Sequence, residues 1–178
     1  MTIAKWNVDI AHSNVDFSVR HMMVSKVKGS FNDFTAEVEA DPNDLTTASL
    51  TFTINMASID TRNDDRDNHL RSADFFEVEK YPELTFTSTE IKRKSEDTYA
   101  VTGNVSMHGV TQPETFNVTF EGVAKDPMSG AEKAGFSVEG TLKRSEYNLT
   151  WNASLETGGV LVSDDVKIHL EIQAAKEA

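Results

Sequence analysis

The five histidines are the residues of this 178-residue chain best suited to acid–base or metal chemistry, because the chain has no cysteine. They are His12, His21, His69, His108 and His169. None lies two, three or four positions from another, which are the spacings that place two ligands on one face of a strand or a helix. A preformed zinc site is therefore not expected, although ligands from separate strands could still converge. We expect no metal and no cofactor.

Motifs for nucleophilic catalysis and for phosphate binding are also missing from the sequence. His12-Ser13 is the only adjacent histidine–serine pair, and neighbours on a strand point to opposite faces, so the two side chains need not meet. Neither a Gly-x-Ser-x-Gly elbow nor a glycine-rich phosphate loop is present. The paired carboxylates Asp64-Asp65 and Asp164-Asp165 fall in polar segments, which indicates solvated charge. We predict that the protein is not an enzyme.

A second cluster, Arg66, Asp67 and His69, allows two interpretations. Arg66 could bind a phosphate or another head group, since a guanidinium forms strong charge-assisted hydrogen bonds. Alternatively, Arg66 and Asp67 pair with each other or with helix caps and hold their segment in place. We favour this structural interpretation, because ion pairs near a protein surface are commonly structural or inert.

The charge balance limits the classes of partner. The chain carries 29 acidic and 17 basic residues, a formal net charge of −12, which repels nucleic-acid phosphates. An anionic bilayer should also be a poor docking surface in general, although a local basic rim is not excluded. No stretch approaches the roughly 18 apolar residues of a membrane span, and nothing resembles a secretory signal. We expect no nucleic-acid partner, no membrane span and a cytoplasmic location.

Alternation of apolar and polar residues is the dominant pattern, as in Leu-Thr-Phe-Thr-Ile-Asn-Met at positions 50–56. About eight such runs are separated by turn-forming residues, for example Gly158-Gly159. A closed barrel or a two-sheet sandwich buries one face of every strand, and we favour the barrel. The sequence thus predicts an all-β fold, a single antiparallel β-barrel domain over residues 1–178. Gly29 is expected to permit a bend or bulge, and residues 174–178 to form a frayed tail.

Residues 63–76 depart from the alternating pattern and are poor strand formers. Asn63 or Asp64 could cap a short helix near Asp64–Ser72, with early carboxylates favoured at its N-terminus. We interpret this segment as a helical crossover against or over one end of the barrel. Leu70 would face the barrel, and Phe75-Phe76 would anchor the exit of the crossover.

Short motifs along most of the chain together carry a family resemblance. They are Trp6 with Asp9, His12-Ser13, Phe17-x-Val19-x-His21, Gly29-x-Phe31-x-x-Phe34, Ser58-Ile59-Asp60-Thr61, Arg66-Asp67-x-His69-Leu70, Asp74-Phe75-Phe76, Tyr81-Pro82, Phe86, Gly103, Gly109-Val110-Thr111, and Arg144 before Tyr147. In this combination the chain resembles the YceI-like family of bacterial lipid-binding proteins. The resemblance implies a lipocalin-like extended barrel that binds polyisoprenoids, such as polyprenyl phosphates and isoprenoid quinones, or related long-chain amphiphiles. It also suggests a homodimer.

The expected ligand-binding residues lie on the inward faces of the strands and beside the crossover. They are Phe17, Val19, His21, Phe34, Phe52, Ile54, Arg66, Leu70, Phe75, Phe76, Phe86, Phe116 and Phe136. Each phenylalanine is as easily a packing residue as a ligand contact. His21 is in phase with Phe17 and Val19, so it is either a donor to the ligand head or to water, or a core histidine with a backbone or hydroxyl partner.

Three functions stay open at this point. The favoured one is non-catalytic lipid binding for storage, transport or stress protection. The second is an interaction protein whose barrel is plugged by side chains and therefore has no cavity. The third is a weak hydrolase or isomerase, which would need a buried His–carboxylate pair beside a cavity.

Overall fold

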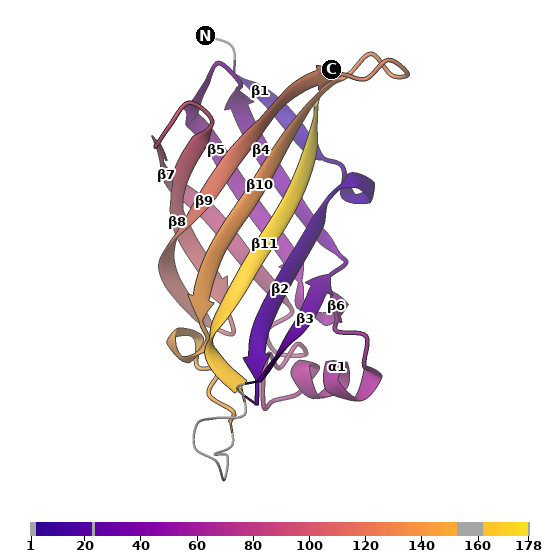
Figure 1. Ribbon diagram of the computed structural model, residues 1–178, viewed down its shortest axis with the longest axis vertical. Helices are drawn as coiled ribbons and strands as arrows, with labels where there is room; N and C mark the ends of the chain where they lie inside the picture. The colour runs from indigo at the N-terminus through magenta and orange to yellow at the C-terminus, as the bar shows by residue number, and fades with distance from the viewer. Residues whose placement is uncertain (1–2, 23, 153–161, 178) are drawn as a thin grey trace.

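The computed structural model describes residues 3–22, 24–152 and 162–177 as a single β-barrel with one short α-helix (Figure 1). The strands are β1 (Ala4–Val8), β2 (Asn14–His21), β3 (Ser25–Phe31), β4 (Phe34–Asp41), β5 (Asp44–Asn55), β6 (Ile59–Asp60), β7 (Glu83–Arg93), β8 (Thr98–Met107), β9 (Val110–Lys125), β10 (Glu132–Lys143) and β11 (Val162–Lys176). The helix is α1 (Asp64–Arg71), and three 3-10 turns are η1 (Ile10–His12), η2 (Met56–Ser58) and η3 (Arg144–Tyr147). The turn expected at Gly158-Gly159 lies outside the described residues.

Eight antiparallel strands close the barrel, in the order β1, β4, β5, β7, β8, β9, β10 and β11, with β11 pairing back onto β1. The predicted barrel of about eight strands is therefore confirmed. Closure removes the exposed sheet edges that would otherwise invite pairing with other chains. The expectation that the chain ends in a frayed tail from residue 174 was wrong. Ala174 is buried and pairs with both Val8 and Ala134, because the last strand is needed to close the barrel.

β2, β3 and β6 extend the barrel at one end. β11 pairs with β1 through Ala174–Lys176 and with β2 through Val162–Glu171, so β1 and β2 are two parts of one kinked strand. The kink is η1, which Asp9 caps by accepting a hydrogen bond from the Ala11 N–H at 3.1 Å. β3 and β6 continue the sheet beside β2. We call this end, which also carries α1, the lower end, and the end with both chain termini the upper end (Figure 1).

Glycines on two strands make room for inward phenylalanine rings. Gly29 lies opposite Phe17, and a Cβ built on Gly29 would come within 2.4 Å of that ring. A Cβ built on Gly140 would likewise come within 2.4 Å of the Phe116 ring. β3 runs through Gly29 without a register shift, so the expected bulge is absent there. Glycine is required at position 29 because any side chain there would clash with the Phe17 ring.

α1 forms where the sequence predicted the crossover. The Asn63 side chain accepts a hydrogen bond from the Arg66 N–H at 3.0 Å and caps the first turn, whose acidic residues suit the positive end of the helix dipole. The helix ends at Arg71, one residue before the predicted end, and Ser72 caps it. Among the described helices, none is long and apolar enough to cross a membrane.

Candidate functional site

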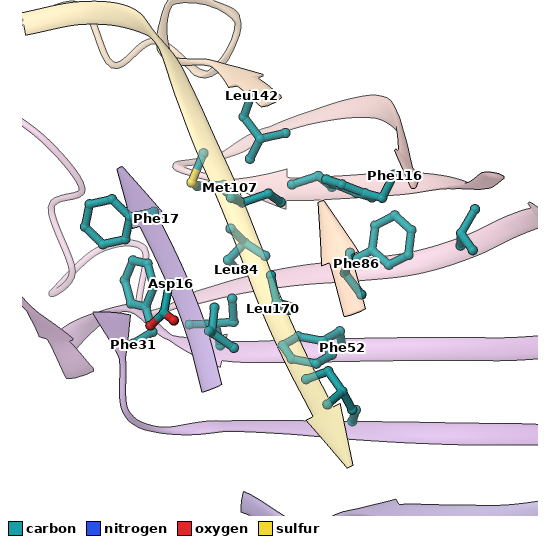
Figure 2. Close-up of a pocket in the computed structure, with 18 of the residues that line it drawn as sticks. Asp16, Phe17, Phe31, Phe52, Leu84, Phe86, Met107, Phe116, Leu142 and Leu170 are labelled. Carbon is teal, nitrogen blue, oxygen red and sulfur yellow. The ribbon is translucent and has the colours of Figure 1, made fainter. Parts of the chain in front are cut away.

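The barrel encloses an apolar cavity of about 270 Å³ that extends along its axis. Figure 2 shows part of its wall, with inward side chains from β2, β3, β5, β7, β8, β9, β10 and β11. The labelled lining residues are Asp16, Phe17, Phe31, Phe52, Leu84, Phe86, Met107, Phe116, Leu142 and Leu170. The alternative of a barrel plugged by side chains required the absence of such a cavity, and the structure contradicts it.

Alternation along the strands supplies this lining. On β11, Ile168, Leu170 and Ile172 occupy every second position, border the cavity and are only partly buried. Val138 on the neighbouring β10 lies opposite Leu170 and also borders the cavity. These side chains keep accessible surface because they face the void, whereas a plugged core would bury them completely.

The upper end of the cavity is closed by a tightly packed cluster around Trp6. Its indole is buried and donates a hydrogen bond from Nε1 to the Ala40 carbonyl at 3.3 Å. Lining residues at the lower end are less enclosed: Val19 and Val162 are half-buried, and Lys143 is exposed. We infer that the cavity opens at this end, because Lys143 is the one exposed residue of the described lining.

Polar residues that border the cavity are few, and three of them have partners. The Asp16 carboxylate accepts a hydrogen bond from Asn14 Nδ2 at 2.6 Å, and Lys143 Nζ pairs with Asp165 Oδ1 at 2.8 Å, which raises the pKa of the lysine. The Arg144 guanidinium is buried and is directed at backbone carbonyls. Its burial lowers its pKa. No cation of the described lining is thus left free to pair with an anionic ligand.

Tyr99 and Tyr147 are the polar lining residues whose hydroxyls have no hydrogen-bond partner in the described chain, and of the two only the hydroxyl of Tyr147 is fully buried. Its side chain is 0 % exposed, and its hydroxyl is the one buried side-chain polar atom in the described part of the chain that has no hydrogen-bond partner. Burial raises the pKa of the phenol well above its ordinary value, and the carboxylates of Glu114 and Glu146 act in the same direction. The hydroxyl is therefore neutral. Buried polar groups in proteins are nearly always hydrogen-bonded, so this hydroxyl is unusual, although it has no accessible surface on the side of the cavity.

Comparison with known proteins places the chain in a family. The model of the YceI-like domain matches residues 6–174. The chain belongs to the YceI-like family. A UPF0312 protein of Staphylococcus epidermidis is 46% identical over 165 residues, which cover 93% of this chain and 94% of the relative. A UPF0312 protein of Staphylococcus aureus is 45% identical over the same length and coverage.

Solved structures share the YceI-like barrel. BcnA of Burkholderia cenocepacia superposes with a TM-score of 0.82 at 27% identity, covering 93% of this chain and 98% of that chain. The YceI protein of Campylobacter jejuni gives a TM-score of 0.78 at 34% identity, covering 89% and 90%. A polyisoprenoid binding domain from Saccharophagus degradans gives 0.67 at 16% identity, covering 97% and 98%, and at that identity shows the fold alone.

Most residues expected to bind ligand in this YceI-like chain border the cavity. Ten of the thirteen do so: Phe17, Val19, Phe52, Ile54, Leu70, Phe75, Phe76, Phe86, Phe116 and Phe136. The ten come from β2, β5, β7, β9, β10, α1 and the segment that follows α1. That they contact a ligand stays a prediction.

Two of the expected inward residues, Phe34 and His21, do not border the cavity. Phe34 is buried, but its ring stacks on Phe52 at a centroid distance of 5.6 Å, so it supports a lining residue from outside the void. His21 is the last residue of β2 and is half-buried. It is in phase with Val19, which does border the cavity, but it lies one step further toward the turn, beyond the end of the void.

Arg66 does not border the cavity either, because it is engaged in holding the crossover. Its Nε donates to Thr61 Oγ1 at 2.8 Å and its Nη2 to the Thr61 carbonyl at 2.6 Å. The buried Asp67 carboxylate accepts from the Thr61 N–H at 2.9 Å and from its hydroxyl at 2.5 Å. Both side chains therefore hold the crossover, but they meet through Thr61 instead of pairing with each other or with caps, and contact of Arg66 with a ligand head group stays a prediction.

The His–carboxylate contacts of the described residues lie in solvent-accessible positions. His69 Nε2 is 2.9 Å from Asp74 Oδ2, with both side chains substantially exposed, and His169 Nε2 is 2.7 Å from Glu171 Oε1 on the outer surface. The His69 ring also packs edge-on against Phe75 and Trp151. A hydrolase or isomerase would need such a pair buried beside the cavity, which these contacts do not supply. Within the described ranges, no three His, Asp or Glu side chains cluster as metal ligands.

Sequence reasoning missed Tyr147 as a site residue. In the sequence, Tyr147 contributed only to the family resemblance. It lies beyond the alternating residues of β10, so no strand pattern predicted the direction of its side chain. The available signal was its polarity close to an apolar run, but only the η3 turn directs this side chain into the barrel wall.

Proposed function

We propose that this YceI-like protein binds a long-chain apolar amphiphile, of the polyisoprenoid or isoprenoid quinone class, inside its barrel and without catalysis. The observation that carries this proposal is the apolar cavity along the barrel axis, closed at the upper end and inferred to open at the lower end. An apolar cavity of this kind offers water few partners and suits an apolar guest.

The energetics favour a flexible hydrocarbon tail. Each CH₂ group moved from water into an apolar site contributes about 0.8 kcal/mol, before the cost of ordering the chain. The tail needs no polar contact along most of the described wall. Storage, transport and stress protection are all compatible with such binding, and the description of one solved relative as a polyisoprenoid binding domain supports the ligand class. The cytoplasmic location and the homodimer stay predictions.

Native mass spectrometry of the freshly purified protein, followed by organic extraction, tests the proposed function. We expect a stoichiometric adduct that extracts as a long-chain isoprenoid, quinone or related amphiphile. A protein that is empty as purified, and that also ignores added geranylgeraniol and a long-chain quinone, would contradict the proposal.

Tyr147 further defines the head group that the cavity accepts. Its neutral hydroxyl has no accessible surface in the unliganded barrel, and a ligand that displaces the wall beside it could exchange one hydrogen bond with it through an oxygen. An anion would meet no free cation in the described lining and would lie near Glu114 and Glu146, whose charges act on Tyr147. Because an unpaired buried charge is very costly, we infer that the oxygen inside the barrel is an alcohol or a carbonyl. A phosphate group would have to stay outside the lower end.

Replacing Tyr147 by phenylalanine tests the head-group inference. We expect geranylgeraniol to bind roughly fivefold more weakly, the value of one neutral hydrogen bond, and the hydrocarbon analogue without the hydroxyl to bind unchanged. The unliganded protein should lose no stability, because the deleted hydroxyl has no partner there. Calorimetric titration of both ligands against both proteins gives the comparison. Equal losses for alcohol and hydrocarbon would show that the hydroxyl does not contact the head group.

A further inference from the structure

The turn between β2 and β3 lies at the lower end of the barrel (Figure 1), and two of its apolar side chains are exposed. Met22 is 48% exposed and Val24 is 82% exposed. Single exposed apolar residues are common on proteins, but here they form the tip of a hairpin. The hairpin stands at the end where the cavity is inferred to open, since Val19 on β2 borders the lower part of the cavity.

A band of exposed cations adjoins this tip on the outer face of the barrel. It consists of Arg20, Lys26, Lys28, Arg62 and Lys167. Arg20 lies directly opposite Lys26, and Lys28 and Lys167 both lie opposite Ser18. Lys28, Arg62 and Lys167 also border one hollow of the outer surface. These cations therefore form one continuous patch.

The cationic band is uncompensated within the described chain. None of its five side chains makes an ion pair or a hydrogen bond with another described residue, in a protein whose net charge is −12. Like charges directly opposite on paired strands, as Arg20 and Lys26 are, destabilise a sheet. An arrangement that costs stability and leaves its cations unpaired points to an anionic partner.

Several carboxylates near the band are set back from the tip or already engaged, whereas Asp64 and Asp65 are exposed at the start of α1, two and three residues after Arg62. Asp16, Asp60 and Glu139 border the same hollow, but they lie one cross-strand row further from the turn. On β11, Asp164 accepts hydrogen bonds from Ser145, and Asp165 pairs with Lys143. From the tip inward, the surface is thus apolar, then cationic, then acidic.

We propose that the β2–β3 hairpin docks on an anionic lipid bilayer, with Met22 and Val24 in the interface and the cationic band at the phosphate level. Residues on a strand are about 3.3 Å apart along its axis, so Lys26 follows Val24 by roughly 7 Å, a depth that suits an interfacial anchor. Charges farther than about 8 Å from the band are screened at physiological salt, so the acidic residues on the rest of the barrel weigh little, whereas Asp16, Asp60 and Glu139 lie close enough to weaken the attraction. One part of this inference rests on the proposed function, namely that docking lets a lipid pass from the membrane into the cavity. In the docked position, the cavity would open toward the membrane that holds the lipid.

Vesicle flotation with the full chain tests the docking. We expect the protein to float with phosphatidylcholine vesicles that contain phosphatidylglycerol, to bind pure phosphatidylcholine far less, and to be released by high salt. Lys26→Glu should weaken binding about tenfold or more, since each cation near an anionic surface is worth about fivefold and the substitution reverses the charge. Val24→Asp should weaken it comparably by removing the apolar tip.

The opposite end of the barrel provides matched controls. Met128 lies in the β9–β10 turn and is 95% exposed, and Lys125 is exposed at the end of β9. The control variants Met128→Asp and Lys125→Glu therefore introduce the same kinds of change at the upper end. Loss of flotation confined to Val24→Asp and Lys26→Glu supports the proposal. Equal flotation of all four variants, or no flotation of the unmodified protein, overturns the docking proposal. The exposed tip would then be assigned to contact with a protein partner.

Titration with geranylgeraniol in solution separates this inference from the proposed function. The hairpin variants should bind the alcohol like the unmodified protein, because neither substituted residue borders the cavity. A protein that floats with vesicles but does not bind the alcohol would retain the docking inference and contradict lipid binding in the barrel. A protein that binds the alcohol but does not float with vesicles would contradict the docking inference and retain lipid binding in the barrel.

Discussion

Leu170→Trp is expected to lower the affinity for geranylgeraniol about fiftyfold while the barrel stays folded. Leu170 projects from β11 into the cavity, opposite Val15 and Val138 (Figure 2). An indole at this position occupies space that the ligand tail needs. Excluding about three CH₂ groups from the cavity removes roughly 2.4 kcal/mol of binding free energy. Calorimetric titration measures the loss, and the heat-capacity change of binding should become less negative as less apolar surface is buried.

The control for Leu170→Trp places the same side chain outside the barrel. Val123 lies on β9 and is 43% exposed, so Val123→Trp adds an indole without touching the cavity. It should bind the alcohol like the unmodified protein. Overpacking at Leu170 is expected to cost about 1–3 kcal/mol of unfolding free energy, which thermal unfolding would detect. A folded Leu170→Trp protein with unchanged affinity would show that the ligand does not occupy this part of the barrel.

Arg144→Met is expected to give the largest loss of stability among the substitutions considered. The Arg144 guanidinium donates to the carbonyls of Ser163 and Leu149 at 2.9 Å, and to those of Trp151 and Val162 at 3.3 Å. It thereby ties the chain after η3 to the start of β11. Methionine fills similar volume but leaves buried carbonyls unpaired, which should cost about 3 kcal/mol. For a chain of this size that corresponds to a Tm roughly 6–12 °C lower.

The neighbouring Lys143 supplies the comparison for Arg144. Lys143 is exposed and pairs with Asp165 at the surface, so Lys143→Met should leave the Tm nearly unchanged. Arg144→Lys should fall between the two, because an ammonium cannot present the planar fork that reaches several carbonyls at once. If Arg144→Met and Lys143→Met melted alike, the carbonyl contacts of Arg144 would not be stabilising the lower end.

Local pattern was sufficient for the strands and for the helical crossover. The alternation at positions 50–56 predicts a strand that faces the core with every second residue, and Phe52 and Ile54 do border the cavity. Asn63 predicts the start of α1, because its side chain satisfies a free N–H of the first turn. Both signals are local, since strand alternation and helix capping depend on residues only a few positions apart.

Long-range register decided what local pattern left open. Phe34 and Phe52 both lie on inward faces, yet only Phe52 borders the void, since Phe34 stacks behind it. Gly29 could have marked a bulge, but pairing with β2 places it opposite the Phe17 ring. Whether the barrel was plugged or hollow was likewise undecided, because the volume left at the axis depends on how side chains from eight strands meet.

The sequence by itself indicated about eight antiparallel strands with a capped crossover and favoured a barrel over a two-sheet sandwich, and its resemblance to the YceI-like family indicated the class of ligand. Only the tertiary structure brought the Tyr147 hydroxyl to the cavity wall without a partner, and gathered Arg20, Lys26, Lys28, Arg62 and Lys167 beside one apolar tip. These residues lie up to 147 positions apart, counting from Arg20 to Lys167. Their proximity follows from strand pairing and barrel closure, which no local window of the sequence records.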